Sequence, residues 1–250
     1  MGFKTDGSVH TNGIANEVNT IAVLNRLGIY SDTVEHRGGT QQKADAVAGS
    51  IGISIKEKMK GIGVGSFDWC NTTKMPMSLS SKFDTFKSIV SELRTLSEAE
   101  RRAEVEMVRS AFNNVSANAF DTFETADLVS FLRSTFAKQA GYDIVITDGK
   151  AKKLYHFSAD EHPVVKMLAD GFTPVLAQPR KAGQTSRSIY FIKDGNVTDS
   201  GLRLRITSNN GISAFLGLSK ANKTSSVVLK LQQDNVSGLL ESVNATSYAI

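Results

Sequence analysis

The chain has 250 residues and a mass of 27.0 kDa, long enough to bury one sizeable core without disulfide bonds. Hydrophobic residues make up 40% and charged residues 22%, with four prolines and one cysteine, which excludes a disordered chain, a collagen-like chain, a disulfide scaffold and a cysteine-rich zinc site. The net charge of +4 comes entirely from residues 141–250, which carry 13 basic and 9 acidic side chains, and it is compatible with a polyanionic partner.

Nothing in the sequence suggests a membrane protein. No apolar run approaches the roughly 18 residues that a membrane-spanning helix needs. The first residues, Met-Gly-Phe-Lys-Thr-Asp, lack the apolar core of a signal peptide. We therefore expect a cytoplasmic protein with no membrane partner.

The first predicted element is a helix over residues 12–28. Apolar residues recur there at helical spacing, Asn12 is suited to begin the helix and Gly28 to end it. A short strand over residues 29–37 and a turn over residues 38–42 are predicted to follow.

Two apolar runs, residues 44–48 and 51–59, are separated only by Gly49-Ser50. This spacing predicts a β-hairpin with a two-residue turn. In that register Ala46 faces Ile53 and Asp45 faces Ser54.

The remaining elements are predicted from composition and periodicity. Residues 61–81 are rich in Gly, Ser, Thr and Asn and are expected to form a long loop or flap. Helices are expected over residues 82–113 and 121–140. Short strands punctuated by turns are expected over residues 142–147, 153–157, 188–192, 202–207 and 226–231.

The hairpin carries the chemistry. Residues opposite one another in a ladder, and residues two apart on a strand, project to the same side, so Asp45, Ser54 and Lys56 should converge on one face. A carboxylate beside a lysine suits metal-assisted phosphodiester hydrolysis, in which the acid holds Mg²⁺ and the lysine orients the attacking water. A second acid is expected nearby.

These residues resemble the PD-(D/E)xK nuclease superfamily, which includes many type II restriction endonucleases and the archaeal Holliday junction resolvases. In the resolvases a Glu on the first helix precedes the Asp, and an acid-x-Lys follows on the next strand. Glu17, Asp45 and Lys56 would occupy those places. The resemblance covers residues 10–60 and implies a restriction-endonuclease-like fold, with Asp45 and Glu17 as metal ligands.

The sequence departs from this pattern at Ser54, where an acid is expected. The resemblance implies that another carboxylate of the fold substitutes for it, with Ser54 in a supporting hydrogen bond. Glu17 is the first candidate, and Glu92 and Asp68 are weaker ones. If the hairpin register slipped by one residue, Glu57 or Lys58 would form the active pair instead.

A plainer interpretation of the hairpin is a solvated edge whose Lys56, Lys58 and Lys60 discourage aggregation. Glu17, on a preceding helix in the right order, favours the nuclease. The glycine-rich segment 61–66 lacks the Lys-Ser/Thr of a phosphate-binding loop, and the four histidines lack metal-ligand spacing.

Contacts to DNA are expected from Lys58, Lys60 and Trp69 beside the hairpin. In the C-terminal portion Arg203 and Arg205 belong to a basic set suited to phosphates and base edges. A solvated β surface is the alternative for each of the C-terminal residues taken singly, and the alternative for Trp69 is that it anchors its loop on the core.

The sequence thus predicts an α/β (α+β) protein: a restriction-endonuclease-like core with a central mixed sheet flanked by helices over residues 1–140, and a β-rich, basic portion for DNA recognition over residues 141–250. The expected activity is that of a Mg²⁺-dependent endonuclease, with Mn²⁺ as a substitute, acting as a homodimer on double-stranded DNA at specific sites. The alternatives are a resolvase-like, structure-selective endonuclease and a catalytically inactive nuclease-fold protein that binds DNA.

Overall fold

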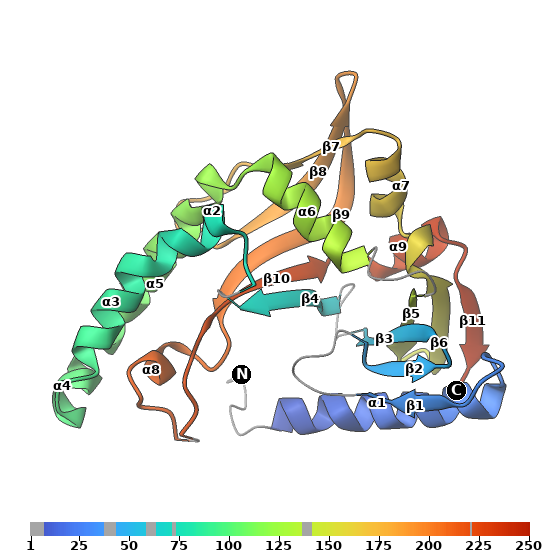
Figure 1. Ribbon diagram of the computed structural model, residues 1–250, viewed down its shortest axis with the longest axis horizontal. Helices are drawn as coiled ribbons and strands as arrows, with labels where there is room; N and C mark the ends of the chain where they lie inside the picture. Colours follow the sequence, from blue (N-terminus) through green and yellow to red (C-terminus); the bar gives the residue numbers. More distant parts are fainter. Residues whose placement is uncertain (1–7, 38–43, 59–63, 72–73, 137–141, 221) are drawn as a thin grey trace. The chain divides into compact units, whose positions relative to one another are not determined.

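The computed structural model describes residues 8–37, 44–58, 64–71, 74–136, 142–220 and 222–250 (Figure 1). The chain forms two compact units, the first made of Met1–Gly65, Arg133–Asp170 and Asp234–Ile250, the second of Ser66–Leu132 and Gly171–Gln233. This division differs from the boundary expected at residue 140. The reason is that each unit builds its sheet from segments that are far apart in the sequence.

The first unit contains a six-stranded mixed sheet. Its strands, in spatial order, are β1 (Val34–His36), β2 (Ala46–Ala48), β3 (Ile51–Glu57), β5 (Tyr142–Asp148), β6 (Lys153–Ser158) and β11 (Thr246–Ala249). β3 and β5 are parallel and the other neighbours are antiparallel. The helical elements of this unit are α1 (Ser8–Leu27), η3 (Ala159–Glu161), α7 (Pro163–Ala169) and α9 (Val236–Ser242).

The predicted first helix is confirmed as α1, although it begins at Ser8 and Asn12 lies within it; it ends where Gly28 takes a left-handed conformation (φ +60°). The Gly28 amide donates to the carbonyl of Asn25 and the Ile29 amide to that of Leu24, which is the usual glycine-capped helix end. The side chain of Asn25 then bonds both backbone groups of Val34, at 2.7 and 3.0 Å. These bonds attach β1 to the end of α1.

α1 packs on one face of this sheet. Its Ile21 and Leu24 join a buried cluster with Ile53 and Ile55 of β3 and Val145 of β5. Burial of such apolar side chains contributes roughly 1.5–3 kcal/mol each. This cluster fixes which face of β3 is covered by the helix.

The predicted hairpin is confirmed, with the expected pairing of Ala46 with Ile53, Val47 with Gly52 and Ala48 with Ile51, but the ladder does not extend to the expected pair of Asp45 and Ser54. Gly49, at φ +57°, supplies the left-handed residue of the two-residue turn. β3 then pairs with β5 in parallel over its length. The central mixed sheet flanked by helices is therefore the observed architecture of this unit.

The second unit contains a separate antiparallel sheet, consistent with the β-rich C-terminal portion that the sequence predicts. Its strands, in spatial order, are β4 (Val64–Asn71), β10 (Val227–Gln233), β9 (Asn196–Ser208), β8 (Ser186–Lys193) and β7 (Thr173–Leu176). Its helical elements are α2 (Met77–Ser80), η1 (Ser81–Phe83), α3 (Asp84–Leu93), α4 (Glu98–Ala103), α5 (Val105–Asn118), η2 (Ala119–Thr122) and α8 (Ile212–Phe215), together with most of α6 (Thr125–Phe136).

The expectation of a long loop over residues 61–81 is wrong for residues 64–71, which form β4 in this sheet, and for residues 77–81, which are helical. Buried Phe67 and Cys70 explain the difference. A segment rich in small polar residues becomes a strand here because a distant partner, β10, forms hydrogen bonds with its backbone.

In the described part of the chain, no helix combines the length and apolar character required to cross a membrane.

Candidate functional site

The hairpin brings together the acid, hydroxyl and lysine that the sequence singled out, around one oxygen of Asp45. Oδ2 of Asp45 accepts the backbone amide of Ile55 at 2.7 Å. The Ser54 hydroxyl lies 3.5 Å from the same oxygen and the Lys56 ammonium 3.4 Å from it. We call these four residues the Asp45 corner.

Local irregularity of the hairpin creates the Asp45 corner. The Asp45 amide donates to the carbonyl of Ile53, which already faces Ala46, so the ladder register breaks here. The next hydrogen bond comes from the Ile55 amide, which donates to the carboxylate of Asp45. A side chain thus replaces the backbone acceptor at this end of the ladder. The convergence is thus observed, although Asp45 does not face Ser54 through the regular backbone pairing that the sequence predicts.

The Asp45 corner is mostly buried but partly open to solvent. Ser54 is buried, whereas the side chains of Lys56 and Asp45 keep 18% and 24% of their accessible surface. Because side chains alternate along a strand, Ser54 and Lys56 project away from the face that α1 covers. The observed register also excludes the shifted arrangement based on Glu57, whose side chain is exposed.

Glu17 has a different partner from the one that the resemblance implies. Its Oε2 lies 3.0 Å from Nε2 of His36 on β1. His36 pairs with Ala46, the residue that follows Asp45, so this contact lies beside the Asp45 corner along the sheet. However, Glu17 belongs to α1 and approaches from the face that carries Ile53 and Ile55. Its role as a second metal ligand stays a prediction.

Lys58 makes an ion pair that sequence reasoning missed. Its ammonium lies 2.8 Å from Oδ2 of Asp148, at the end of β5, while Oδ1 of Asp148 accepts the amides of Lys150 and Ala151. The bond from Lys58, supported by these amides, holds the pKa of the Asp148 carboxyl below its usual range. Asp148 thereby shapes the β5–β6 turn, and only the parallel pairing of β3 with β5 brings it to Lys58.

The other residues predicted to contact DNA are placed as follows. Lys60 lies outside the described residues, and Trp69 belongs to β4, where its side chain is not described. Arg203 and Arg205 both lie on β9 in the second unit. The candidates Glu92 and Asp68 belong to the second unit.

A second polar cluster lies in the first unit, on the face that α1 covers. Oδ2 of Asp143 lies 3.0 Å from the Tyr30 hydroxyl and 2.6 Å from Nε2 of His156. Burial, reinforced by the charge of Asp143, raises the pKa of the Tyr30 hydroxyl, so Tyr30 stays neutral and donates. These residues are 113 and 13 positions apart from Asp143 in the chain, so local spacing gives no signal for the cluster.

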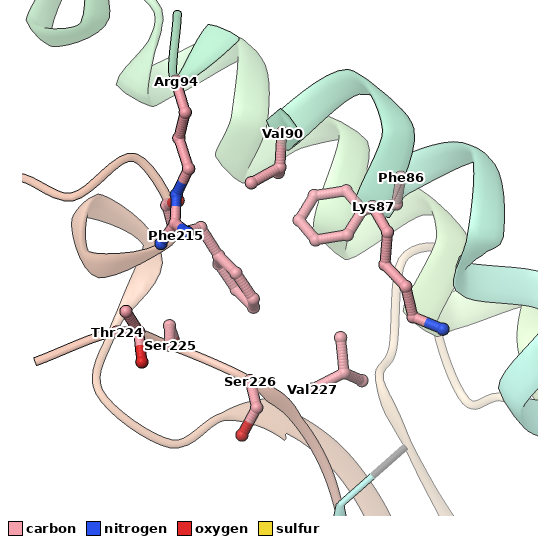
Figure 2. A pocket seen from close by; sticks show the side chains of 9 residues that line it. All are labelled: Phe86, Lys87, Val90, Arg94, Phe215, Thr224, Ser225, Ser226 and Val227. Atoms are coloured by element: carbon pink, nitrogen blue, oxygen red, sulfur yellow. The ribbon is translucent and has the colours of Figure 1, made fainter. Parts of the chain in front are cut away.

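The second unit holds a cavity of about 360 Å³. Figure 2 shows the side chains of Phe86, Val90 and Phe215 around it, with Lys87 and Arg94 at opposite ends. The Arg94 guanidinium donates to the carbonyl of Phe215 at 2.6 Å, so it fastens α8 to the end of α3. The Lys87 ammonium is paired with Asp84. The cations at this cavity therefore have structural partners.

Among the residues that the structure describes, no three His, Cys, Asp or Glu side chains are grouped so as to share a metal ion. Comparison with known proteins assigns no family to the chain, because no family model, no curated protein and no solved structure matches it. The resemblance to the PD-(D/E)xK nucleases therefore rests on this chain's own Asp45, Lys56 and Glu17.

Proposed function

We propose that this protein is a Mg²⁺-dependent DNA endonuclease that uses the Asp45 corner. The observation that carries the proposal is the convergence of Ser54 and Lys56 on one carboxylate oxygen of Asp45, within 3.5 Å, on a sheet face turned away from α1. An acid and a lysine held together and partly open to solvent suit phosphodiester hydrolysis with a divalent ion.

The donor set of the Asp45 corner fits Mg²⁺ in one specific way. Mg²⁺ keeps several of its waters and is commonly bound through one or two carboxylates together with substrate phosphates. The corner offers the carboxylate of Asp45 and the hydroxyl of Ser54, so the substrate would complete the coordination. When bound, the ion would polarise the phosphoryl group and acidify a water.

The chain's own contribution comes from Lys56. Its ammonium is restrained 3.4 Å from Oδ2 of Asp45, and 18% of the side chain stays accessible. In the proposed reaction it orients the attacking water and stabilises the charge that develops on the phosphate. Ile55 holds the Asp45 carboxylate through its amide, which preorganises the acid.

The test is cleavage of supercoiled plasmid with Mg²⁺, and with EDTA as the blank, by the wild type, Asp45→Asn, Lys56→Ala and the control Lys166→Ala. Lys166 is exposed on α7 and carries the same charge as Lys56. We expect the first two variants to lose at least about 100-fold in rate while Lys166→Ala keeps the wild-type rate. Wild-type cleavage by Lys56→Ala would refute the proposal.

A comparison of two DNA substrates distinguishes a resolvase-like, structure-selective activity from a site-specific one. A four-way junction and a linear duplex of equal length are offered at equal salt. Preferential cutting of the junction would indicate a structure-selective enzyme. Cutting at fixed positions of the linear duplex would indicate sequence recognition, by a homodimer if the active species elutes at twice the chain mass.

A catalytically inactive, DNA-binding version of the fold is the second candidate, and one observation favours it. In the described part of the chain the Asp45 corner contributes a single carboxylate, which is already paired with Lys56. A calorimetric Mg²⁺ titration in the presence of uncut duplex decides between the two. Absence of ion binding, together with DNA affinity that is unchanged in Asp45→Asn, would support the inactive version.

A further inference from the structure

Strands β8, β9 and β10 of the second unit share one polar face. On β9 and β10, Leu202, Leu204, Leu229 and Leu231 are buried on one side. The alternate positions project to the other side and include Arg203, Arg205, Lys230 and Gln232, with Ser186 and Ser188 of the neighbouring β8 in register. We call this set the β9–β10 polar face.

Two cations of this face stand directly opposite each other. Arg205 on β9 pairs with Lys230 on β10, and Ser186 of β8 pairs with Arg205 on its other side. Like charges in opposed positions of a ladder destabilise a sheet. Burial of Lys230, and secondarily the charge of Arg205, lowers the pKa of the Lys230 ammonium.

Nothing in the described part of the chain offsets this repulsion, because no described carboxylate lies within ion-pair distance of Arg205 or Lys230. Elsewhere the chain does pair its cations, as with Lys58 and Asp148. A pair of like charges on a sheet face, with Arg205 exposed and Lys230 half-buried, is suited to an anionic partner that supplies the missing charge.

We propose that the β9–β10 polar face binds the phosphate backbone of double-stranded DNA. Neighbouring strands lie about 4.8 Å apart, so Arg205 and Lys230 start from adjacent backbone positions on this face. The hydroxyls of Ser186 and Ser188 in the same rows are suited to donate to phosphate oxygens. The inference rests on the proposed function only for the choice of DNA as the polyanion, and it places the phosphate contacts in the unit that does not hold the Asp45 corner.

The test measures binding without cleavage. The full-length protein is titrated into a fluorescent 30-base-pair duplex in EDTA, and anisotropy is followed between 50 and 300 mM salt. The variants are Arg205→Ala, Lys230→Ala, Lys230→Arg and the control Arg109→Ala. Arg109 is an exposed cation on helix α5, so its substitution removes the same charge from a site outside the sheet.

We expect Arg205→Ala and Lys230→Ala each to weaken binding roughly 3- to 10-fold at 0.1 M salt and to reduce the slope of log affinity against log salt by about 1. Lys230→Arg keeps the wild-type slope, and the affinity of Arg109→Ala stays close to that of the wild type.

Lys230→Met, measured by thermal unfolding, should be at least as stable as the wild type, because the change relieves the repulsion with Arg205. A lower melting temperature would refute this account of the cation pair.

Affinities and salt slopes of Arg205→Ala and Lys230→Ala that match those of Arg109→Ala would overturn the proposal, as would the absence of duplex binding by the wild type at 50 mM salt. These outcomes are separate from the nuclease test, because EDTA removes the metal. A protein that binds DNA through this face and never cuts it would refute the nuclease alone. A protein that cuts DNA but binds it independently of Arg205 and Lys230 would refute this inference alone.

Discussion

The carboxylate of Asp45 and the backbone amide of Ile55 form a 2.7 Å hydrogen bond that ends the regular part of the β2–β3 ladder. Asp45 therefore has two roles: it completes the backbone bonding of β3, and it is the acid that we propose for catalysis. A variant that removes the whole side chain would confuse the two, because a buried amide left without a partner destabilises the fold.

Substitution at Asp45 separates these roles. Asp45→Asn keeps a carbonyl oxygen for Ile55, so its free energy of unfolding should stay within about 1 kcal/mol of the wild type, whereas Asp45→Ala should lose about 1–3 kcal/mol. Urea unfolding followed by circular dichroism measures both. If Asp45→Asn is as unstable as Asp45→Ala, the hydrogen bond to Ile55 is not what holds the end of the ladder.

Asp148 should make stability depend on pH in the acidic range. Its pKa is held below the usual range by the bond from Lys58 and by the turn amides, so the stabilisation is present above the ordinary aspartate pKa of about 3.9 and is lost as the pH falls through the lower, folded-state value. Asp148→Asn keeps an acceptor for the turn but loses the ion pair. The difference in unfolding free energy between wild type and Asp148→Asn should therefore be largest near pH 7 and shrink below pH 4. A constant difference from pH 7 to pH 2.5 would contradict the ion pair.

Tyr30 should make stability depend on pH in the alkaline range. The hydroxyl bond to Asp143 contributes about 1 kcal/mol, which Tyr30→Phe should remove at pH 7. Because the folded-state pKa of Tyr30 is raised, the stabilisation is complete below the ordinary tyrosine pKa of about 10 and declines as the pH rises above it, since the unfolded chain then ionises first. The wild type should consequently lose more stability between pH 9 and pH 11 than Tyr30→Phe does. Parallel curves for the two proteins would argue against a buried, neutral Tyr30.

Arg187 is the buried cation of the second unit. Only 4% of its surface is accessible, its Nη2 donates to the carbonyl of Ala117 at 2.8 Å, and its guanidinium lies over the ring of Phe120. Lysine cannot reproduce this planar set of donors, so Arg187→Lys should cost about 1–3 kcal/mol in unfolding free energy.

The control for Arg187 is Arg109→Lys, on an exposed helix surface, where the change in stability should be negligible. Urea unfolding of both variants at pH 7 gives the comparison. An Arg187→Lys protein as stable as its control would show that the guanidinium geometry does not matter.

How much the sequence predicts depends on how local each contact is. The end of α1 at Gly28 and the register of Ala46 with Ile53 follow from residues close together in the chain, and both are confirmed. The approach of Lys56 to Asp45 spans 11 positions of one hairpin, so alternation along the strands was enough to predict it.

The contacts that sequence reasoning missed join distant segments. Lys58 and Asp148 are 90 positions apart, and Tyr30 and Asp143 are 113 positions apart. The sequence predicts a loop where β4 forms, because the composition of this segment is typical of loops, and the pairing of β4 with β10 supplies what local propensity does not.

The sequence by itself determined the α/β character, the hairpin and the residues that meet at the Asp45 corner, because turn chemistry and side-chain alternation act over a few residues. Only the tertiary structure decided that β5 lies parallel to β3, that the chain divides into two units built from interleaved segments, and that Arg205 stands opposite Lys230. Such pairings depend on the burial gained when distant segments close on each other, which outweighs local preference.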